Sequence, residues 1–475
     1  MSLILGGGIS GLAAAFYALK SAPKPGAITL LESSSRLGGW VRSVQSPEGL
    51  IFEKGPRTIR PKGRLGANTL KLVEDLGLAE QVIPITSSHP TAQNRLIYVN
   101  KKLHKLPSNF FSLFKTHSPF SKPLIFSILH DLTTKTVPKT DESIYDFVSR
   151  RFGSEVADYA VSSMICGICA GDAKKISVNF LMAKLFELEQ LHGGVIKGAI
   201  KEMMSKRPDL SGYEESELYR RSRIEKWSVW SVEGGLQTIV NTLGEHLSNK
   251  VEVKMDTTCT NLEFLEKGVK VTLNNDQHIE ANHVVSALPA PKLGMLLHKQ
   301  HPTLGNLLSS IEHVNVAVIN LAYENIPMKQ NAFGFLVPPR EKLPILGVVF
   351  DSCCFEQADW TILTVMMGGA WYDTYFKGQS KEYILDIACR YVHEILDMPR
   401  TPHAQHVEIL KACIPQYTLG HAARVKDIQG YIDTHQLPLY LTGSSYDGVG
   451  VNDVIALSKK AVESIKWQHW GAQAG

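Results

Sequence analysis

Three glycines near the start of the chain limit its fold more than any other feature. They follow a strand-like segment, Leu3–Leu5, in the spacing Gly6-x-Gly8-x-x-Gly11, and an alanine-rich helix is expected from there to about Ser21. The first glycine permits a tight turn, the second lets a diphosphate touch the backbone, and the third lets the helix pack on the strand. Free N–H groups and the positive end of the helix then bind the diphosphate. The sequence therefore predicts the first unit of a doubly wound α/β sheet that binds a nucleotide.

An acidic residue stands at the end of the next predicted strand, which runs from Ala27 to Glu32. A carboxylate at this place binds the ribose hydroxyls of a dinucleotide and repels a phosphorylated ribose. NADP is therefore disfavoured, and NAD and FAD remain. Residues 36–40 are similar to the glycine-rich second signature of amine-oxidase-type flavoproteins, which makes Arg36 a candidate for contacting the diphosphate. The alternative is that Arg36 is an ordinary surface arginine.

A second glycine-rich turn lies near the other end of the chain. It follows a strand-like segment, Leu439–Thr442, contains Gly443, Gly448 and Gly450, and leads into a helix predicted over Asn452–Ile465. A flavin is served by two electron-poor helix ends, one at the diphosphate and one at the N1–C2 carbonyl edge of its ring, where reduction places negative charge. Because NAD does not need the second end, the two turns together favour FAD.

Charge and cysteine content exclude several other classes of protein. The 50 Lys and Arg residues against 46 Asp and Glu leave a formal charge of +4, which is too small and too evenly spread for nucleic-acid binding. The seven cysteines are an odd number and do not form a disulfide framework. Cys166 and Cys169 have CxxC spacing, but their flanks predict a helix entering a glycine-rich turn, whereas a redox motif follows a strand. No second Cys/His pair has ligand spacing, so no metal site is predicted.

Changes of pattern along the 475 residues divide the chain into three parts. Residues 1–88, 225–297 and 432–475 together carry the alternating pattern of a Rossmann-like FAD-binding domain. Residues 89–224 are mainly helical and form an inserted domain, and residues 298–431 alternate as strands before a long helix and form a sheet-plus-helix domain. A hairpin is expected across Asn100. The fold class is therefore α/β with two further domains.

Five further motifs make the chain similar to one family over nearly its whole length. They are Glu53-Lys-Gly-Pro-Arg57, Gln93-Asn-Arg95, Gly167-x-x-Ala-Gly-Asp172, Trp230-Ser-Val-Glu-Gly-Gly-Leu236 and Ile414-Pro-Gln-Tyr-x-x-Gly-His421. With the two nucleotide signatures, they resemble the protoporphyrinogen oxidase family, in its oxygen-dependent animal form. The resemblance implies oxidation of protoporphyrinogen IX to protoporphyrin IX in haem biosynthesis, by hydride transfer to flavin N5 with O₂ as the terminal oxidant. It also implies that residues 89–224 are a membrane-associated domain and residues 298–431 a substrate-binding domain. The protein is further expected to be a homodimer bound peripherally to the inner mitochondrial membrane, on the intermembrane-space side.

The resemblance assigns roles to individual positions. It makes Arg95, Arg57 and Gly167 the residues closest to the reaction, with Arg95 binding a substrate propionate. A guanidinium suits this role because it binds a carboxylate in two places and stays charged. The residues implied to bind the macrocycle are Arg95, Phe333, Gly334, Leu336, Val349 and Met366. Those implied to bind FAD are Gly6, Gly7, Gly8, Ile9, Ser10, Gly11, Glu32, Arg36, Gly39, Trp40, Gly55, Pro56, Arg57, Thr58, Val253, Gly448, Val449, Gly450 and Val451.

One stretch of the helical part, residues 109–126, has the composition of a membrane-surface segment. It combines several phenylalanines with Lys115 and Lys122 and is interrupted by prolines. Such a segment inserts shallowly into a bilayer and places its lysines near the phosphates. The alternative is a loop that packs on its own domain. Nowhere do eighteen apolar residues run together, so a transmembrane helix is not predicted.

Two other functions fit part of the sequence. A flavin-containing amine or polyamine oxidase shares both nucleotide signatures, but Cys413-Ile-Pro-Gln-Tyr417 lacks the Gly-Cys-Tyr sequence by which many such enzymes attach flavin covalently. Non-covalent FAD is therefore expected. A non-catalytic flavin-binding or porphyrin-binding protein is the second alternative, because no general acid or base stands out in the sequence.

Overall fold

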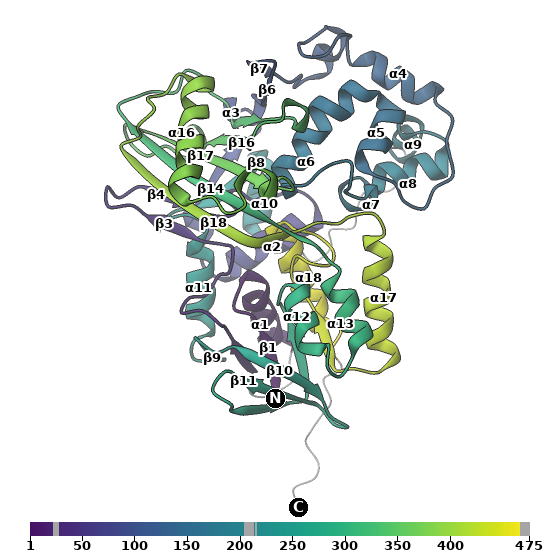
Figure 1. The fold of residues 1–475 in the computed structure, drawn as a ribbon, viewed down its shortest axis with the longest axis vertical. Coiled ribbons are helices and arrows are strands. Elements are labelled where there is room, and N and C mark those ends of the chain that lie inside the picture. The colour runs from purple at the N-terminus through teal and green to yellow at the C-terminus, as the bar shows by residue number, and fades with distance from the viewer. Residues whose placement is uncertain (22–27, 204–212, 214–215, 466–475) are drawn as a thin grey trace, which may run out of the picture.

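The computed structural model describes residues 1–21, 28–203, 213 and 216–465. Ala27 and the parts of the predicted domains that fall in 22–27, 204–212, 214–215 and 466–475 lie outside the described residues. Figure 1 shows three regions: a lower layer that contains both the first and the last helices, a sheet above it, and a group of helices beside that sheet.

The lower layer is built on a five-stranded sheet in which every neighbouring pair is parallel. Successive residues of each strand face opposite sides of this sheet. Ile4 and Leu30 pack against helices on one side, whereas Leu3 and Leu31 pack against a second sheet on the other side. This alternation buries both faces, as parallel sheets require. In spatial order the strands are β19 (Leu439–Leu441), β13 (His283–Ser286), β1 (Ser2–Leu5), β2 (Ile28–Leu31) and β9 (Glu252–Lys254). The predicted doubly wound α/β fold is confirmed.

Two different layers cover the parallel sheet. The helices on one face are α1 (Ile9–Ser21), α2 (Gly63–Asp75), α10 (Glu217–Ile224), α11 (Gln237–Leu247) and α18 (Val451–Glu463). The other face carries an antiparallel sheet and three helices, namely β10 (Cys259–Phe264), β11 (Val269–Leu273), β12 (His278–Ala281), α12 (Ala290–Leu297), α13 (Pro302–Ser309) and α17 (His421–Thr434). Residues 302–309 and 421–434, which the sequence placed with the sheet-plus-helix domain, thus pack on this layer.

The upper sheet has seven strands, mostly antiparallel, and the long helix α16 (Lys381–Leu396) covers one of its faces. The strands in spatial order are β18 (Ala404–Pro415), β14 (His313–Glu324), β17 (Trp360–Gly369), β16 (Ile345–Phe350), β15 (Gly334–Leu336), β6 (Leu96–Val99) and β7 (Lys102–Lys105). Two short helices and two strand pairs join the layers. The helices are α14 (Asp351–Cys354) and α15 (Tyr372–Phe376), and the strand pairs are β3 (Ser43–Gln45) with β4 (Ile51–Glu53) and β5 (Val82–Thr86) with β8 (Trp227–Val232).

The predicted hairpin across Asn100 is present, but it does not belong to the helical region. Asn100 and Lys101 both have positive φ, as a two-residue hairpin turn requires, and β6 pairs in parallel with β15. The segment 89–224 therefore contributes two strands to the upper sheet before it becomes helical. Local sequence specifies a hairpin, but its partner strand lies more than two hundred residues away.

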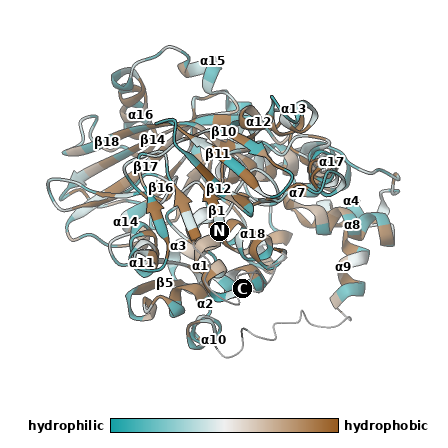
Figure 2. Cartoon of the chain, turned by 90° about the horizontal axis from the view of Figure 1, so that it is seen from below, coloured by the Kyte–Doolittle hydropathy of each residue, from teal (hydrophilic) through white to brown (hydrophobic). Residues whose placement is uncertain are grey.

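The helical region is held together by a buried charge network. Arg151, which is fully buried, donates from Nε to Asp131 Oδ1 at 2.6 Å and lies 3.6 Å from Glu189. Asp131 also accepts from the N–H of Ile196 at 2.8 Å. Figure 2 shows α4, α8 and α9 together at one side of the molecule, away from α1 and α11. The elements are α3 (Pro90–Gln93), α4 (Ile125–Thr133), α5 (Ile144–Phe152), a π-helix (Val156–Val161), α6 (Ser162–Cys169), α7 (Val178–Leu181), α8 (Ala183–His192) and α9 (Val195–Met203).

Candidate functional site

The first glycine-rich turn has the geometry that the sequence predicted. Gly6 has φ +98°, and a Cβ on Gly11 would lie 1.8 Å from the carbonyl oxygen of Gly6, so that only glycine fits there. The first bond of α1 runs from Leu12 N to Gly8 O at 3.0 Å. The N–H groups of Ile9, Ser10 and Gly11 precede this bond and have no acceptor inside the helix. They are free to bind an anion.

The turn before α18 places a second helix end at the same edge of the parallel sheet as the first. The first bond of α18 runs from Val454 N to Gly450 O, which leaves the N–H groups of Val451, Asn452 and Asp453 without backbone acceptors inside the helix. The N–H of Gly450 is capped by Asp453 Oδ2 at 2.8 Å. Ser458 Oγ of α18 donates to Ser10 O of α1 at 2.8 Å, so the two helices are in direct contact. Because β1 and β19 run parallel in the same sheet and each is followed by one of these helices, both positive helix ends lie at the carboxyl edge of that sheet.

The acidic and basic residues beyond the first turn hold its loops in place. Glu32 accepts from the N–H of Gly7 at 2.7 Å and from Ser34 with its other oxygen. Arg36 donates to the carbonyls of Leu37 and Gly39 at 3.1 and 2.6 Å. Their contacts to a ribose and a diphosphate stay predictions. Both residues fix the backbone through which a nucleotide would be bound.

A cavity of about 580 Å³ opens at the end of the parallel sheet beside these loops. Arg36 and Val253, two of the predicted cofactor residues, line it together with residues of α11. Two helix ends at one edge of the sheet, a carboxylate after β2 and an adjacent cavity provide groups of the kind that FAD requires. The chain therefore offers a donor set that fits FAD.

The turn Gly55-Pro56-Arg57 is pressed against the loop that contains Trp40. A Cβ on Gly55 would lie 1.9 Å from the carbonyl oxygen of Trp40, so this approach requires glycine. Arg57 follows with a side chain that is 10% exposed, and its Nε lies 3.6 Å from Asp351 Oδ1. Its Nη1 is buried and has no hydrogen-bond acceptor among the described residues. Such an atom points to an absent partner, which suits the predicted contact of Arg57 with cofactor or substrate.

Arg57 is connected to the upper sheet by polar side chains that sequence reasoning missed. Asp351 Oδ2 accepts from Thr364 Oγ1 at 2.7 Å, and Asn320 Nδ2 donates to Thr364 Oγ1 at 2.8 Å and to Glu53 O at 3.1 Å. Burial raises the pKa of Asp351, and the positive charge of Arg57 partly offsets this rise. This network joins the turn that contains Arg57 to strands β14 and β17. Polar residues at the centre of apolar strands were the signal that could have identified it.

Four of the five apolar positions predicted to bind substrate lie on strands of the upper sheet. Phe335, Val348 and Val365 face α16, so the alternate positions face the opposite side of the sheet. Registers pair Gly334 with Val349 and Gly347 with Met366, which places these positions side by side. The residues that share this face are Gly334, Leu336, Val349 and Met366, and Phe333 adjoins them through a bond from its N–H to Asn94 O at 3.2 Å.

Gly167 lies against the same face of the upper sheet. It belongs to α6, and a Cβ on it would come within 2.8 Å of Leu336 Cδ2. Cys166 and Cys169 are on the same helix, buried, and not in a disulfide. Burial raises the pKa of the Cys169 thiol to about 12, and it raises that of Cys166 as well. Neither thiol is therefore a thiolate at neutral pH, and the interpretation that this pair is not a redox motif stands.

Arg95 lies at the start of β6, next to these positions. Desolvation, followed by the like charge of Arg60, lowers the pKa of Arg95, although part of its side chain contacts solvent. Among the described residues, no carboxylate lies within ion-pair distance of Arg95 or Arg60. Arg60 is also tied to α18, because its carbonyl accepts from Asn452 Nδ2 at 2.8 Å. Two unpaired guanidinium groups near a helix end suit a carboxylate ligand, and sequence reasoning missed Arg60.

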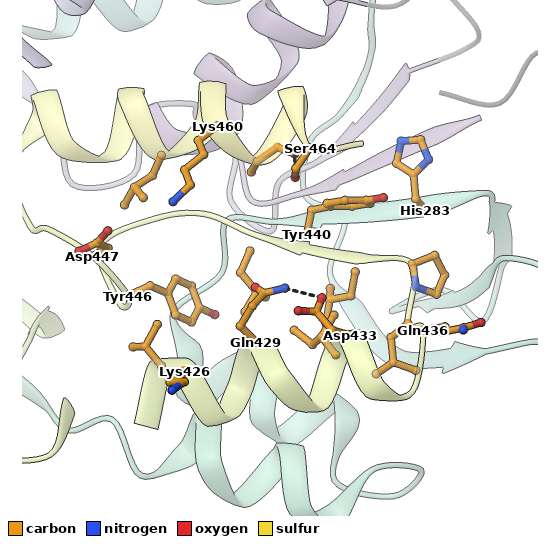
Figure 3. A pocket seen from close by; sticks show the side chains of 18 of the residues that line it. His283, Lys426, Gln429, Asp433, Gln436, Tyr440, Tyr446, Asp447, Lys460 and Ser464 are labelled. Atoms are coloured by element: carbon orange, nitrogen blue, oxygen red, sulfur yellow. Dashed lines mark hydrogen bonds between the residues drawn. The ribbon is translucent and has the colours of Figure 1, made fainter. Parts of the chain in front are cut away.

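A much larger cavity, of about 2270 Å³, lies elsewhere, between α17, α18 and strand β19. Lys426 and Gln429 of α17 face Lys460 of α18 across it, and Tyr446 points into it from the turn before α18 (Figure 3). Of the predicted site residues, Gly448 is the one that lines this cavity. The large cavity therefore adjoins the outer side of the candidate site and does not coincide with that site.

Comparison with known proteins agrees with this geometry. A family model described as flavin containing amine oxidoreductase matches residues 9–465. The protein named protoporphyrinogen oxidase from Bos taurus is 41% identical over 472 residues, which cover 98% of each chain. The protein of that name from Homo sapiens is 40% identical over 473 residues, with the same coverage. A solved structure of a putative protoporphyrinogen oxidase from Exiguobacterium sp. 255-15 has a TM-score of 0.80, covers 98% of both chains and is 23% identical, which bears on the fold alone.

Proposed function

This chain belongs to the family of flavin-containing amine oxidoreductases, and on that premise we propose that it oxidises protoporphyrinogen IX to protoporphyrin IX in haem biosynthesis. The observation that carries the proposal is the identity of 40% and 41% to the two mammalian proteins named protoporphyrinogen oxidase, over 98% of each chain. The reaction is an oxidation in which O₂ is the terminal oxidant.

FAD is the cofactor, held without a covalent bond. The diphosphate is bound by the free N–H groups at the start of α1, and the N1–C2 edge of the ring by those at the start of α18. Glu32 binds the ribose, and the cavity lined by Val253 holds the adenine. When bound, FAD supplies a hydride acceptor at N5 and passes the electrons to O₂. The free Nη1 of Arg57 supports a place for the ring near the Gly55-Pro56-Arg57 turn.

The porphyrinogen is bound beside the face of the upper sheet that carries Gly334, Leu336, Val349 and Met366. Arg95 binds a propionate, and Arg60 adds a second positive charge to the same end of the site. The apolar positions on the face that carries Leu336 and Met366 contact the macrocycle and exclude water from it. Gly167 lets the backbone of α6 approach Leu336 on this face, because it has no side chain of its own. In this proposal the protein orients the substrate rather than supplying a general base.

Aromatic side chains on the helical region support binding to a membrane surface. Phe110, Phe111 and Phe114 are 64%, 81% and 53% exposed and contact one another, with Lys115 and Lys122 in the flanking sequence. Exposed phenylalanines beside lysines bind the interface of a bilayer. In the described part of the chain, every helix is too short or too polar to cross a membrane. The family resemblance, rather than these side chains, is the basis for the finer proposal that the enzyme is a homodimer bound peripherally to the inner mitochondrial membrane, on the intermembrane-space side.

A single anaerobic experiment tests the proposed function. The purified protein, reconstituted with FAD, is mixed with protoporphyrinogen IX without oxygen, and the absorbance of oxidised flavin is followed. We expect the flavin to bleach, protoporphyrin fluorescence to appear, and the flavin colour to return with air. Bleaching by putrescine or benzylamine but not by the porphyrinogen would establish an amine oxidase instead. Flavin that is bound but bleached by neither would establish a binding protein.

A further inference from the structure

The turn before α18 is held by two side chains that lie between β18 and α17. Tyr417 is 3% exposed, and its hydroxyl donates to Ser444 O at 2.6 Å while it accepts from Gly448 N at 2.8 Å. His421 Nε2 donates to Tyr446 O at 2.9 Å. Three backbone groups of one short turn are thus bonded to two neighbouring rings. The turn cannot move its N–H groups without breaking these bonds.

The two rings also support each other. The rings of Tyr417 and His421 are stacked, with centroids 3.9 Å apart and planes 8° from parallel, and Phe180 packs edge-on against Tyr417 at 4.5 Å. Burial raises the pKa of Tyr417 far above neutrality and lowers that of His421. The phenol therefore keeps the proton that it donates, and the imidazole stays neutral. No charge of their own competes with the dipole of α18.

The same short segment reaches the other wall of the site. Gln416, the residue before Tyr417, donates from Nε2 to Cys169 O at 3.0 Å, at the end of the helix that carries Gly167. One connection between β18 and α17 therefore fixes both the turn before α18 and the end of α6. Neither contact is needed to form the strand or the helix that it connects.

We propose that Tyr417 is a positioning residue whose hydroxyl fixes the turn before α18 and thereby favours the reduced flavin over the oxidised flavin at that helix end. The inference rests on the proposed binding of FAD. Reduction places negative charge at the N1–C2 edge, so N–H groups held toward this edge stabilise the reduced ring more than the oxidised one. A phenylalanine at 417 keeps the stack but releases Gly448 N and Ser444 O.

The chain offers a matched control for Tyr417→Phe. Tyr446 is 7% exposed, lies in the same turn and points into the cavity in Figure 3, and its hydroxyl has no hydrogen-bond partner among the described residues. Tyr446→Phe therefore removes a buried hydroxyl without removing a bond that holds the turn. Both variants and the wild-type protein are loaded with FAD, and the flavin midpoint potential is measured against a reference dye.

We expect Tyr417→Phe to bind reduced FAD about tenfold less well relative to oxidised FAD, which lowers the midpoint potential by about 30 mV for two electrons. Tyr446→Phe keeps the wild-type potential. An unchanged potential in Tyr417→Phe, or an equal shift in both variants, overturns the inference while the proposed function stands. Wild-type protein that binds no FAD overturns the proposed function itself.

A second measurement and a second variant cover the loss of cofactor or of folded protein. If Tyr417→Phe loses FAD during purification, hydrogen exchange of residues 443–450 is compared in the two apoproteins. Exchange faster than in Tyr446→Phe supports the role of Tyr417, and equal exchange contradicts it. If Tyr417→Phe does not fold, His421→Gln is used, because losing the stacked imidazole loosens the ring of Tyr417 and thereby weakens both bonds of its hydroxyl. A smaller shift to lower potential is then expected, and an unchanged potential contradicts the inference.

Discussion

Glu53 is a buried carboxyl at the end of β4, and its replacement by glutamine should stabilise the protein at neutral pH. Its oxygens accept from Leu236 N and from Ser43 Oγ, each at 2.8 Å. Burial nevertheless raises its pKa from 4.5 to about 7, against which these bonds and the charge of Arg57 act. Glutamine has the same shape and keeps an oxygen for Leu236, but it has no charge to bury.

The size and sign of the effect follow from the pKa of Glu53. The folded protein keeps this proton up to about pH 7, whereas the unfolded chain releases it near pH 4.5. Between these values the folded state binds more protons, so its stability falls as the pH rises, and the loss is complete above pH 7. A rise from 4.5 to about 7 corresponds to about 3 kcal/mol at most. Glu53→Gln should therefore match wild type near pH 4.5 and exceed it by about 1–3 kcal/mol at pH 8.

Urea unfolding followed by tryptophan fluorescence from pH 5 to pH 8.5 measures this difference. Glu266→Gln, at an exposed carboxyl of the β10–β11 turn, is the control and should follow the wild-type profile. A gap between Glu53→Gln and wild type that stays constant over this pH range would refute the reasoning, because it would mean that Glu53 does not titrate there.

Three further results are expected. Arg95→Ala should raise KM for protoporphyrinogen by about 10- to 150-fold, the value of a hydrogen bond to a charged group at about 1.5–3 kcal/mol, and an unchanged KM in steady-state assays would remove Arg95 from the site. Gly11→Ala, whose Cβ would lie 1.8 Å from Gly6 O, should abolish FAD binding in a fluorescence titration, and wild-type affinity would contradict the close approach of α1 to the turn. Phe111→Asp, at a side chain that is 81% exposed, should reduce co-sedimentation with anionic vesicles and leave activity in detergent unchanged, whereas unchanged sedimentation would exclude this aromatic cluster as a membrane contact.

Local pattern was enough to predict the nucleotide-binding half of the molecule. The spacing of Gly6, Gly8 and Gly11 and the turn before α18 depend on neighbouring residues, and the structure places both turns at the same edge of the parallel sheet. The strands β14 to β17 of the upper sheet and the mainly helical character of the inserted region were also predicted from periodicity, whereas the long strand β18 was not. The domain boundaries at 89 and 298 stay predictions, although the hairpin at 96–105 and the helices at 302–309 and 421–434 pack across them.

The parts that sequence reasoning missed depend on contacts between distant segments. Asp351 and Thr364 look like ordinary residues of strands and their ends, and their importance appears only when Arg57 is brought beside them. Arg60 follows the recognised motif by three residues, but the sequence does not show that it approaches Arg95. Tyr417 belongs to a motif that was identified, yet its bonds to the turn before α18 require the folded chain.

The contact between Ser10 and Ser458 joins the first helix of the chain to the last one. A ribosome that adds about 5–20 residues per second needs about 20–90 s to synthesise the intervening residues. During that time α1 has emerged without the helix that completes the proposed FAD site, so we expect flavin loading to follow synthesis rather than accompany it. Fragments of the protein that lack either end should accordingly depend on chaperones and remain colourless.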